Sequence, residues 1–100
     1  MRILALLTPA AGKNPADFDP LVVAEDKAAW AAYRAGTIRE LYFQPEPLTV
    51  SMVFEAESHA EVERALAAFP MMEAGLLNMS LVTQGPWVTL ETLFDKAHLA

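Results

Sequence analysis

Four short apolar runs along the chain predict β-strands. They read RILALLT, TIRELYFQ, LTVSMVFEA and LLNMSLVTQ, at residues 2–8, 37–44, 48–56 and 76–84. Each run has the length of a strand, and proline, a Gly-Pro step or a polar Glu-Ser step closes it. We therefore expect a four-stranded sheet.

A long helix is predicted between the first two strands. Asn14 is a suitable N-cap and Pro15 suits the first helical position. Alanine-rich sequence continues to Ala35, and Gly36 is a suitable C-cap. Pro20 lies in the first turns of this helix and is expected to kink or delay it.

A second helix is predicted after the third strand. Ser58 and Glu61 have the spacing of a capping box, in which the serine accepts from the backbone and the glutamate reaches back to the N-cap. Apolar residues then recur on one face until Pro70, where the helix is expected to stop.

The order βαββαβ predicts an α+β, ferredoxin-like fold with an antiparallel four-stranded sheet. Val50, Met52 and Phe54 share one face of the third strand, but Val53 lies on the other, and the first strand also has leucines on both faces. Two helices cover only one face. We therefore expect the bare face to pack on a second copy, which gives a dimeric α/β barrel.

The chain is expected to divide into a domain at residues 1–86 and a tail at residues 87–100. Apolar residues of the tail recur at helical spacing: Trp87, Leu90, Leu93 and Phe94. The four-stranded unit has no free helix-covered face to receive them. We expect the tail to dock on a partner subunit.

The composition narrows the function classes. With 100 residues, 54% hydrophobic and 20% charged, the chain fits one ordered domain with excess apolar surface that protein must bury. The longest uncharged stretch, residues 74–90, is shorter than a bilayer span of about 20 residues. A net charge of −6 argues against nucleic acid as a partner.

The residue types also limit the chemistry. The absence of cysteine excludes disulfides, thiol nucleophiles and iron–sulfur clusters, and two histidines, His59 and His98, make a histidine-rich metal site improbable. We expect no metal and no cofactor. The N-terminal apolar run has five residues, too few for a signal peptide, so we expect a cytoplasmic protein.

Glu25 is the first candidate catalytic residue. At 100° per residue it falls within the apolar stripe of the long helix, which comprises Phe18, Leu21, Val22, Ala29 and Ala32. A carboxylate that faces the sheet loses hydration, which raises its pKa unless a cation compensates. Such a group can take and return protons near neutral pH. The alternative is an ion pair with Arg39 that only fixes the helix to the sheet.

Arg39 is the second candidate catalytic residue. Strict alternation along residues 37–44 places it on one face with Leu41 and Phe43, opposite a face that carries Ile38, Glu40, Tyr42 and Gln44. A guanidinium in an apolar wall can hold a substrate carboxylate through two hydrogen bonds. The alternative is an edge residue that pairs with Glu40 or Glu55.

Four further residues are candidate substrate-binding residues: Tyr33, Tyr42, Phe43 and Met52. The tyrosines can donate hydrogen bonds to a ligand, although tyrosines in a core also satisfy their hydroxyls locally. Methionine also fills gaps in a core without any ligand role.

Four segments together resemble the muconolactone isomerase family: AEDK at 24–27, AGTIR at 35–39, VFEAES at 53–58 and LAAFP at 66–70. The resemblance implies a dimeric α/β barrel that assembles into larger oligomers. It also implies proton transfer along an unsaturated lactone with an acetate side chain, without cofactor or metal. Glu25 and Arg39 match an acidic and an arginine position of the family, whereas Ile38, Glu40 and Phe43 depart from it.

The sequence therefore predicts a small cofactor-free enzyme of the muconolactone isomerase type, which transfers a proton on a compact, anionic, partly apolar metabolite. Glu25 is expected to shuttle the proton, and Arg39 to anchor a carboxylate or stabilise enolate charge. Two alternatives stay open. One is a non-catalytic dimeric barrel that binds a small ligand or a partner, and the other is a cofactor-free monooxygenase-type barrel.

Overall fold

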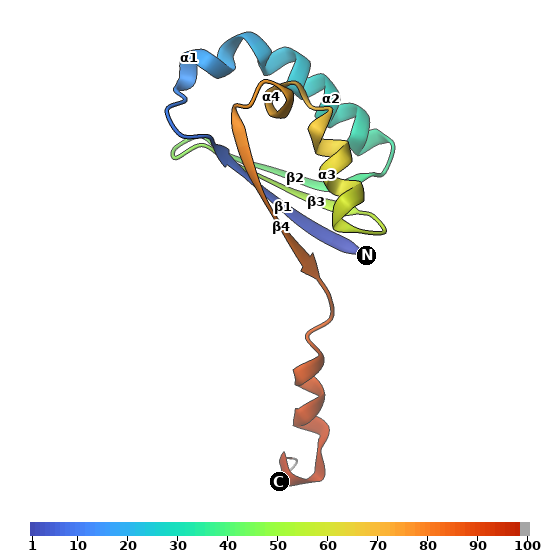
Figure 1. Ribbon diagram of the computed structural model, residues 1–100. Helices are drawn as coiled ribbons and strands as arrows, with labels where there is room; N and C mark the ends of the chain where they lie inside the picture. The colour runs from blue at the N-terminus through green and yellow to red at the C-terminus, as the bar shows by residue number, and fades with distance from the viewer. Residues whose placement is uncertain (99–100) are drawn as a thin grey trace.

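Four antiparallel strands form the predicted sheet in the computed structural model, which describes residues 1–98. The strands are β1 (Arg2–Pro9), β2 (Ile38–Gln44), β3 (Thr49–Glu55) and β4 (Leu77–Gln84). Their order in the sheet is β2-β3-β1-β4, and all helices of the domain lie on one face (Figure 1). The α+β, ferredoxin-like βαββαβ fold is confirmed.

The predicted long helix forms in two parts. These are α1 (Pro15–Phe18) and α2 (Val22–Arg34), joined by a 3₁₀ turn, η1 (Asp19–Leu21), that contains Pro20. Proline has no N–H and disfavours helical geometry in the residue before it, which explains the interruption. At the N-terminus, the side chain of Asp17 accepts a 2.9 Å hydrogen bond from the Asn14 N–H.

Gly36 ends α2 with a positive φ of 82°. The N–H groups of Gly36 and Thr37 donate to the carbonyls of Tyr33 and Ala32, both at 3.1 Å, which is the hydrogen-bond pattern of a Schellman cap. A Cβ added at Gly36 would meet no atom within 4 Å. Strain at this position would therefore come from the backbone alone.

Replacing Gly36 by Ala is expected to lower the free energy of unfolding by about 1–2 kcal/mol, because L-residues are disfavoured at left-handed φ. Gly85→Ala is the matched control, since Gly85 also has open space around its Cβ position but no left-handed φ. It is expected to leave stability unchanged or to raise it slightly. Urea unfolding of both variants measures the difference, and equal effects would contradict a role for the glycine cap.

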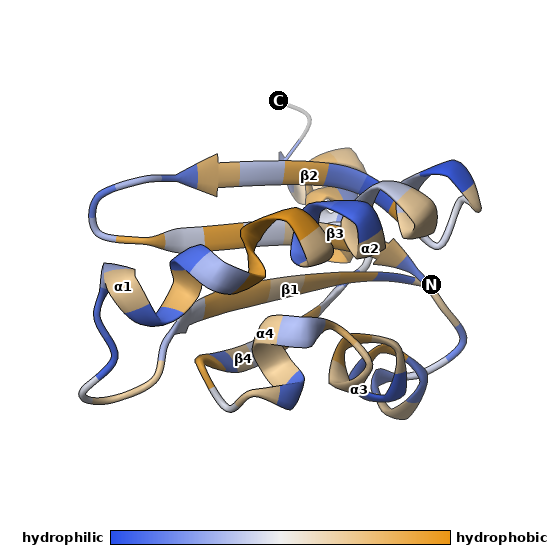
Figure 2. Ribbon diagram, turned by 90° about the horizontal axis from the view of Figure 1, so that it is seen from above, coloured by the Kyte–Doolittle hydropathy of each residue, from blue (hydrophilic) through white to orange (hydrophobic). Residues whose placement is uncertain are grey.

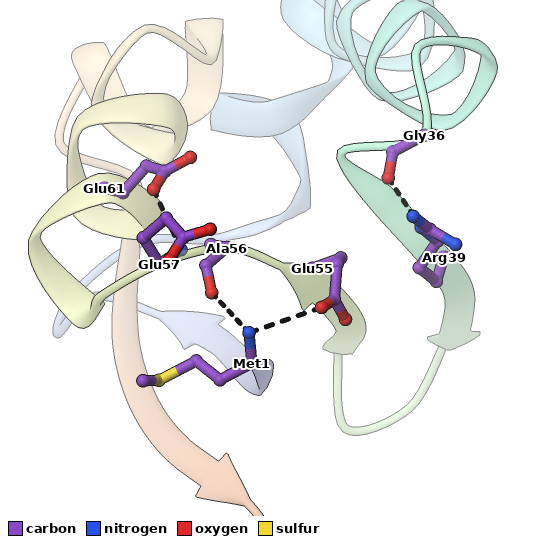
Figure 3. A network of polar contacts seen from close by, with 7 residues as sticks. All are labelled: Met1, Gly36, Arg39, Glu55, Ala56, Glu57 and Glu61. Carbon is purple, nitrogen blue, oxygen red and sulfur yellow. Dashed lines mark hydrogen bonds and ion pairs between the residues drawn. The ribbon is translucent and has the colours of Figure 1, made fainter.

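The second predicted helix is α3 (His59–Ala67), and a short helix that was not predicted, α4 (Pro70–Glu73), follows it. The Ser58 hydroxyl accepts from the Glu61 N–H at 3.2 Å, as expected. The Glu61 side chain accepts from the Glu57 N–H at 2.9 Å, one residue earlier than the capping box predicts (Figure 3). Pro70 opens α4 because proline fits a first helical position.

The core lies between the helices and the covered face of the sheet (Figure 2). Its fully buried side chains are Ile3, Ala5, Leu7, Ile38, Phe54, Val62 and Leu66. The burial of alternate residues in β1 follows from the two-residue period of a strand. Phe18 of α1 also belongs to this core, so α1 is packed on the sheet.

A register shift between Ile38 and Glu40 changes the expected faces of β2. Ile38 pairs with Phe54 in the core, and Leu41 and Phe43 pair with Met52 and Val50 on the same covered side. The prediction that Ile38 lies on the face opposite Leu41 and Phe43 is therefore wrong. The extra residue in the strand is Arg39.

No helix in the described part of the chain covers the other face of the sheet (Figure 1). Val53, Leu4 and Val82 form an apolar row across β3, β1 and β4 on this open face. Leu6 lies in the next row between two serines, Ser51 and Ser80. The open face is thus apolar in its centre and polar around it, rather than apolar throughout.

The tail leaves the domain after β4 and projects away from the sheet (Figure 1). It forms two 3₁₀ helices, η2 (Val88–Phe94) and η3 (Lys96–His98). Its apolar side chains at helical spacing are exposed in the single chain. The last two residues of the predicted tail, 99 and 100, lie outside the described residues. Within residues 1–98, no helix is long and apolar enough to span a bilayer.

Candidate active site

A cleft of about 810 Å³ lies between α1, η1 and α2 on one side and the end of the sheet with the β2–β3 hairpin on the other. Figure 2 shows α1 and this hairpin at the same end of the molecule. Apolar and aromatic side chains supply most of its wall, among them Phe18, Leu41, Phe43, Val50, Met52 and Met71. An apolar cleft with few polar groups is the usual form of a small-molecule site.

Glu25 is the buried charged residue of this cleft, with 8% of its surface exposed. Val22, Glu25 and Ala29 line the cleft together because their spacing of three and four places them on one face of α2. The Glu25 Oε1 accepts a 2.9 Å hydrogen bond from the Met71 N–H at the start of α4. The predicted position of Glu25 within the apolar face of the helix is confirmed.

Burial raises the pKa of Glu25 above its usual value of 4.5. The hydrogen bond from Met71 lowers this pKa and the nearby charge of Asp26 raises it, but loss of hydration is the largest of the three effects. None of the ion pairs among residues 1–98 involves Glu25. The carboxyl group therefore lies in a mostly apolar cleft and forms no ion pair with a described residue.

The raised pKa makes stability depend on pH in a definite direction. A carboxyl group with a raised pKa in the folded state stabilises the fold below its unfolded pKa, and this contribution is lost as pH rises through the folded value. Glu25→Gln stays neutral and keeps an acceptor for the Met71 N–H. The variant is therefore expected to unfold at higher urea than the wild type at neutral pH, and the gain is expected to vanish below about pH 4.5.

Urea titrations of both proteins across this pH range measure the effect. A variant that is less stable than the wild type by the same amount at every pH would contradict it, because that result indicates loss of a contact rather than relief of a buried charge. A loss of about 3–5 kcal/mol is the result expected when a buried charge loses its partner. The structure gives Glu25 no such partner among the described residues.

Arg39 does not line the cleft. Its Nε donates a 2.7 Å hydrogen bond to the Gly36 carbonyl (Figure 3). The alternative of a Glu25–Arg39 pair is therefore wrong, and so are the alternatives in which Arg39 pairs with Glu40 or Glu55. Arg2 pairs with Glu40 at 3.8 Å, and the N-terminal amine pairs with Glu55 at 3.3 Å.

The four candidate substrate-binding residues separate into two groups. Phe43 and Met52 line the cleft. Tyr42 also borders it, but its hydroxyl donates to Glu40 Oε1 at 2.7 Å. Tyr33 lies instead in a second groove of about 460 Å³ between α2 and β2, where its ring stacks on Trp30 at 5.7 Å. Arg39 lines this second groove as well.

Sequence reasoning missed several cleft residues. Lys13 is the one cation among the residues that line the cleft, while Asp19, Asp26 and Glu46 add carboxylates at its border. Lys13 follows Gly12 in the loop that precedes the Glu25-bearing helix, and this closeness in sequence was the available signal. The Met71 N–H was missed because α4 was not predicted.

Other titratable groups do not form a second site in the described residues. His59 Nε2 makes a 2.7 Å hydrogen bond with the Thr83 hydroxyl at the surface, away from the cleft lining. Within residues 1–98, no three His, Cys, Asp or Glu residues are placed to hold a metal ion together. The cleft around Glu25 is therefore the candidate active site.

Comparison with known proteins finds solved structures with a similar fold, but no similar sequence family. No protein-family model matches the chain, and no curated protein matches it significantly. A crystal structure of muconolactone isomerase is similar, with a TM-score of 0.66 and 20% identity over 87% of this chain and 93% of that one.

A second similar structure is the 5-chloro-2-hydroxyhydroquinone dehydrochlorinase of Burkholderia phenoliruptrix in complex with 2,5-dihydroxybenzoquinone. Its TM-score is 0.61 at 18% identity, over 89% of this chain and 98% of that one. The chain thus has the fold of these two enzymes, and the resemblance to muconolactone isomerase in its sequence is confirmed at the level of the fold.

Proposed function

We propose that this chain is a cofactor-free enzyme that transfers a proton within a small, partly apolar metabolite, with Glu25 as the acid–base group. The observation that carries the proposal is the buried Glu25 carboxyl, which lines a cleft of substrate size and forms no ion pair within residues 1–98. A carboxyl group with a raised pKa is suited to exchange protons near neutral pH. The shared fold with an isomerase and a dehydrochlorinase supports the same assignment.

The hydrogen bond to Met71 divides the roles of the two carboxyl oxygens. Oε1 accepts from the Met71 N–H, which fixes the orientation of the group. No buried side-chain oxygen in the described residues lacks a partner, so Oε2, which has no such bond, is accessible from the cleft. Oε2 takes a proton from a carbon beside a carbonyl group and returns it to another carbon of the conjugated system. The double bond moves and no electrons are gained or lost.

The proposal that the substrate is an anion depends on Lys13. An anionic metabolite needs a cation to hold its carboxylate, and Arg39 lies outside the cleft. Lys13 is the cation at the cleft border and takes the anchoring role in this proposal. The carboxylates of Asp19, Asp26 and Glu46 oppose an anion, so its carboxylate binds at the Lys13 end of the cleft.

The active unit of the proposal is a homodimer. The open face of the sheet carries the apolar row Val53, Leu4 and Val82, and no described helix covers this face. Val53 is buried in the single chain, whereas Leu4 is half-buried and Val82 is exposed. Two such faces packed together bury the exposed part of both rows and close the barrel. This arrangement buries apolar side chains that a single copy of the chain leaves exposed.

Hydrogen–deuterium exchange tests the proton-transfer function directly. The protein is incubated in D₂O with a panel of unsaturated lactones and unsaturated ketones, each offered with and without an acetate side chain, and proton NMR follows the C–H signals. Enzyme-dependent loss of one C–H signal, with or without movement of the double bond, is the expected result. Shifted ligand signals without any exchange would contradict the proposal and favour a ligand-binding barrel.

A further inference from the structure

Among residues 1–98, the two most exposed large apolar side chains lie in the tail. Trp87 is 74% exposed and Phe94 is 75% exposed, with Val88, Leu90 and Leu93 between them. The tail projects beyond the sheet, on the side opposite the helices (Figure 1). None of these five side chains is buried by the domain of its own chain.

The form of η2 is difficult to maintain in isolation. It is a 3₁₀ helix of seven residues, and runs of this type longer than three or four residues are uncommon. Isolated helices shorter than about 12–15 residues are marginal in water even for good helix formers. An ordered segment of this length therefore needs a surface to pack against.

The side chains of η2 are arranged for such a surface. Residues three apart lie on one side of a 3₁₀ helix. Leu90 and Leu93 thus form one apolar stripe, and Val88 and Phe94 form a second with Glu91 between them. Threonines occupy the third side. A surface complementary to η2 is therefore apolar and carries a cation that can pair with Glu91.

The groove between α2 and β2 offers apolar side chains and one arginine. Trp30, Tyr33, Leu41 and Tyr42 line it with Arg39. Glu40 also lines it, but its carboxylate pairs with Arg2 and accepts from the Tyr42 hydroxyl. The Arg39 guanidinium forms no ion pair among the residues 1–98, because Arg2 is the partner of Glu40. Trp30 is 59% exposed and Tyr33 is 45% exposed, so their stacked rings offer apolar surface to a second element.

The groove of the same chain lies across the width of the sheet from the tail. The tail follows β4 at one edge, whereas the groove borders β2 at the other edge, and the tail points away from the helix side (Figure 1). Three strand spacings of about 4.8 Å separate the two edges. The tail therefore extends toward the region that a second copy occupies in the proposed face-to-face dimer.

A second copy brings its groove to the tail. Ile38, Phe54, Ile3 and Thr83 lie side by side across the sheet, so β2 begins at the end where β4 finishes. A two-fold axis parallel to the strands, between stacked sheets, places the β4 edge of one copy beside the β2 edge of the other. Because the axis runs along the strands, the end where β4 of one copy finishes lies beside the end where β2 of the other copy begins. Each tail leaves its own sheet beside the partner's α2–β2 groove.

We propose that η2 of one copy binds the α2–β2 groove of a second copy, with Leu90 and Leu93 against the Trp30 and Tyr33 rings and Glu91 beside Arg39. The exchange is reciprocal, so both tails and both grooves are used in one closed dimer. The orientation of the two copies rests on the face-to-face dimer of the proposed function. The contact itself does not depend on catalysis.

The absence of cysteine makes disulfide cross-linking a direct test. Leu90→Cys and Tyr33→Cys are made as two separate full-length variants, each at an exposed position, then mixed under mild oxidation. A disulfide requires the two Cα atoms to come within about 7 Å. A covalent dimer of the two different variants, resolved by mass, is the expected product, and it necessarily joins two copies.

Two further mixtures are negative controls, because they place the second cysteine outside the α2–β2 groove. Leu90→Cys with Val22→Cys at the cleft, and Leu90→Cys with Leu6→Cys on the open face, are expected to give at least tenfold less mixed dimer. Equal or greater yield at either control position, or no mixed dimer with Tyr33→Cys, would overturn the proposal. If the wild type is dimeric but Leu90→Cys and Tyr33→Cys give no mixed disulfide, the tail contact is overturned and the face-to-face dimer stands.

Discussion

Glu25→Gln is expected to lower the rate of enzyme-dependent proton exchange by about 10²–10⁴-fold, the usual contribution of a positioned acid–base group. The substitution keeps the shape of the side chain and an oxygen that accepts from the Met71 N–H, but the amide cannot take a proton from carbon. The fold and the oligomeric mass are expected to stay unchanged. The deuterium-exchange assay in the best substrate of the panel measures this loss.

Glu46→Gln is the matched control. Glu46 also lines the cleft, but it is exposed and lies in the hairpin between β2 and β3. Its substitution makes the same chemical change at the border of the cleft and is expected to leave the exchange rate within a factor of a few. Equal losses in the two variants would contradict the assignment, because they would indicate a general effect of charge on substrate binding.

The pH dependence of the wild type gives a second readout of the same role. A general base must be ionised, so kcat/KM falls on the acid side with the pKa of that group in the free enzyme. Burial raises this pKa for Glu25, which places the acid limb above the usual value of 4.5. An acid limb at or below that value would indicate a well-hydrated carboxylate as the base.

The position of Glu25 could be predicted because a helix has a fixed period. A rotation of 100° per residue places Glu25 on the side of Val22 and Ala29, and neither the break at Pro20 nor the 3₁₀ turn changes this within α2. The strands were predicted for a similar reason, since apolar runs closed by proline leave few other arrangements. Both inferences depend only on neighbours in sequence.

The face of Ile38 was predicted incorrectly because one extra residue, Arg39, shifts the alternation of the strand. The register of β2 against β3 changes between Ile38 and Glu40, and every residue after the shift then faces the other side relative to Ile38. No glycine lies within the strand to mark the irregularity. The shift depends on the pairing with β3, which the sequence of β2 does not contain.

The remaining part of the site comes from contacts between distant segments. Glu25 and Met71 are 46 residues apart, and their hydrogen bond exists only because α4 packs beside α2. Lys13 enters the cleft because the loop after β1 lies opposite the β2–β3 hairpin. Such contacts require the assembled fold, so the local pattern could identify the buried carboxyl group but not the backbone group that orients it or the cation that lines the same cleft.

Val82→Arg is expected to weaken the face-to-face dimer by about 10²–10³-fold, so that the measured mass falls toward that of the monomer at micromolar concentration. A buried charge without a partner costs about 3–5 kcal/mol, and each 1.4 kcal/mol changes an equilibrium tenfold. Val82 lies in the apolar row of the open face, beside Leu4. It is 52% exposed in the single chain, so the arginine variant is expected to fold.

Val23→Arg is the control for this experiment, because Val23 is an even more exposed valine on α2, on the helix side of the sheet. The same change of charge and size at Val23 is expected to leave the mass unaltered. Sedimentation or light scattering of both variants and the wild type decides the point. If Val82→Arg keeps the full mass, the open face does not join the copies, because an arginine from each copy could not be buried there without partners. If both variants dissociate equally, added positive charge rather than the apolar row governs assembly.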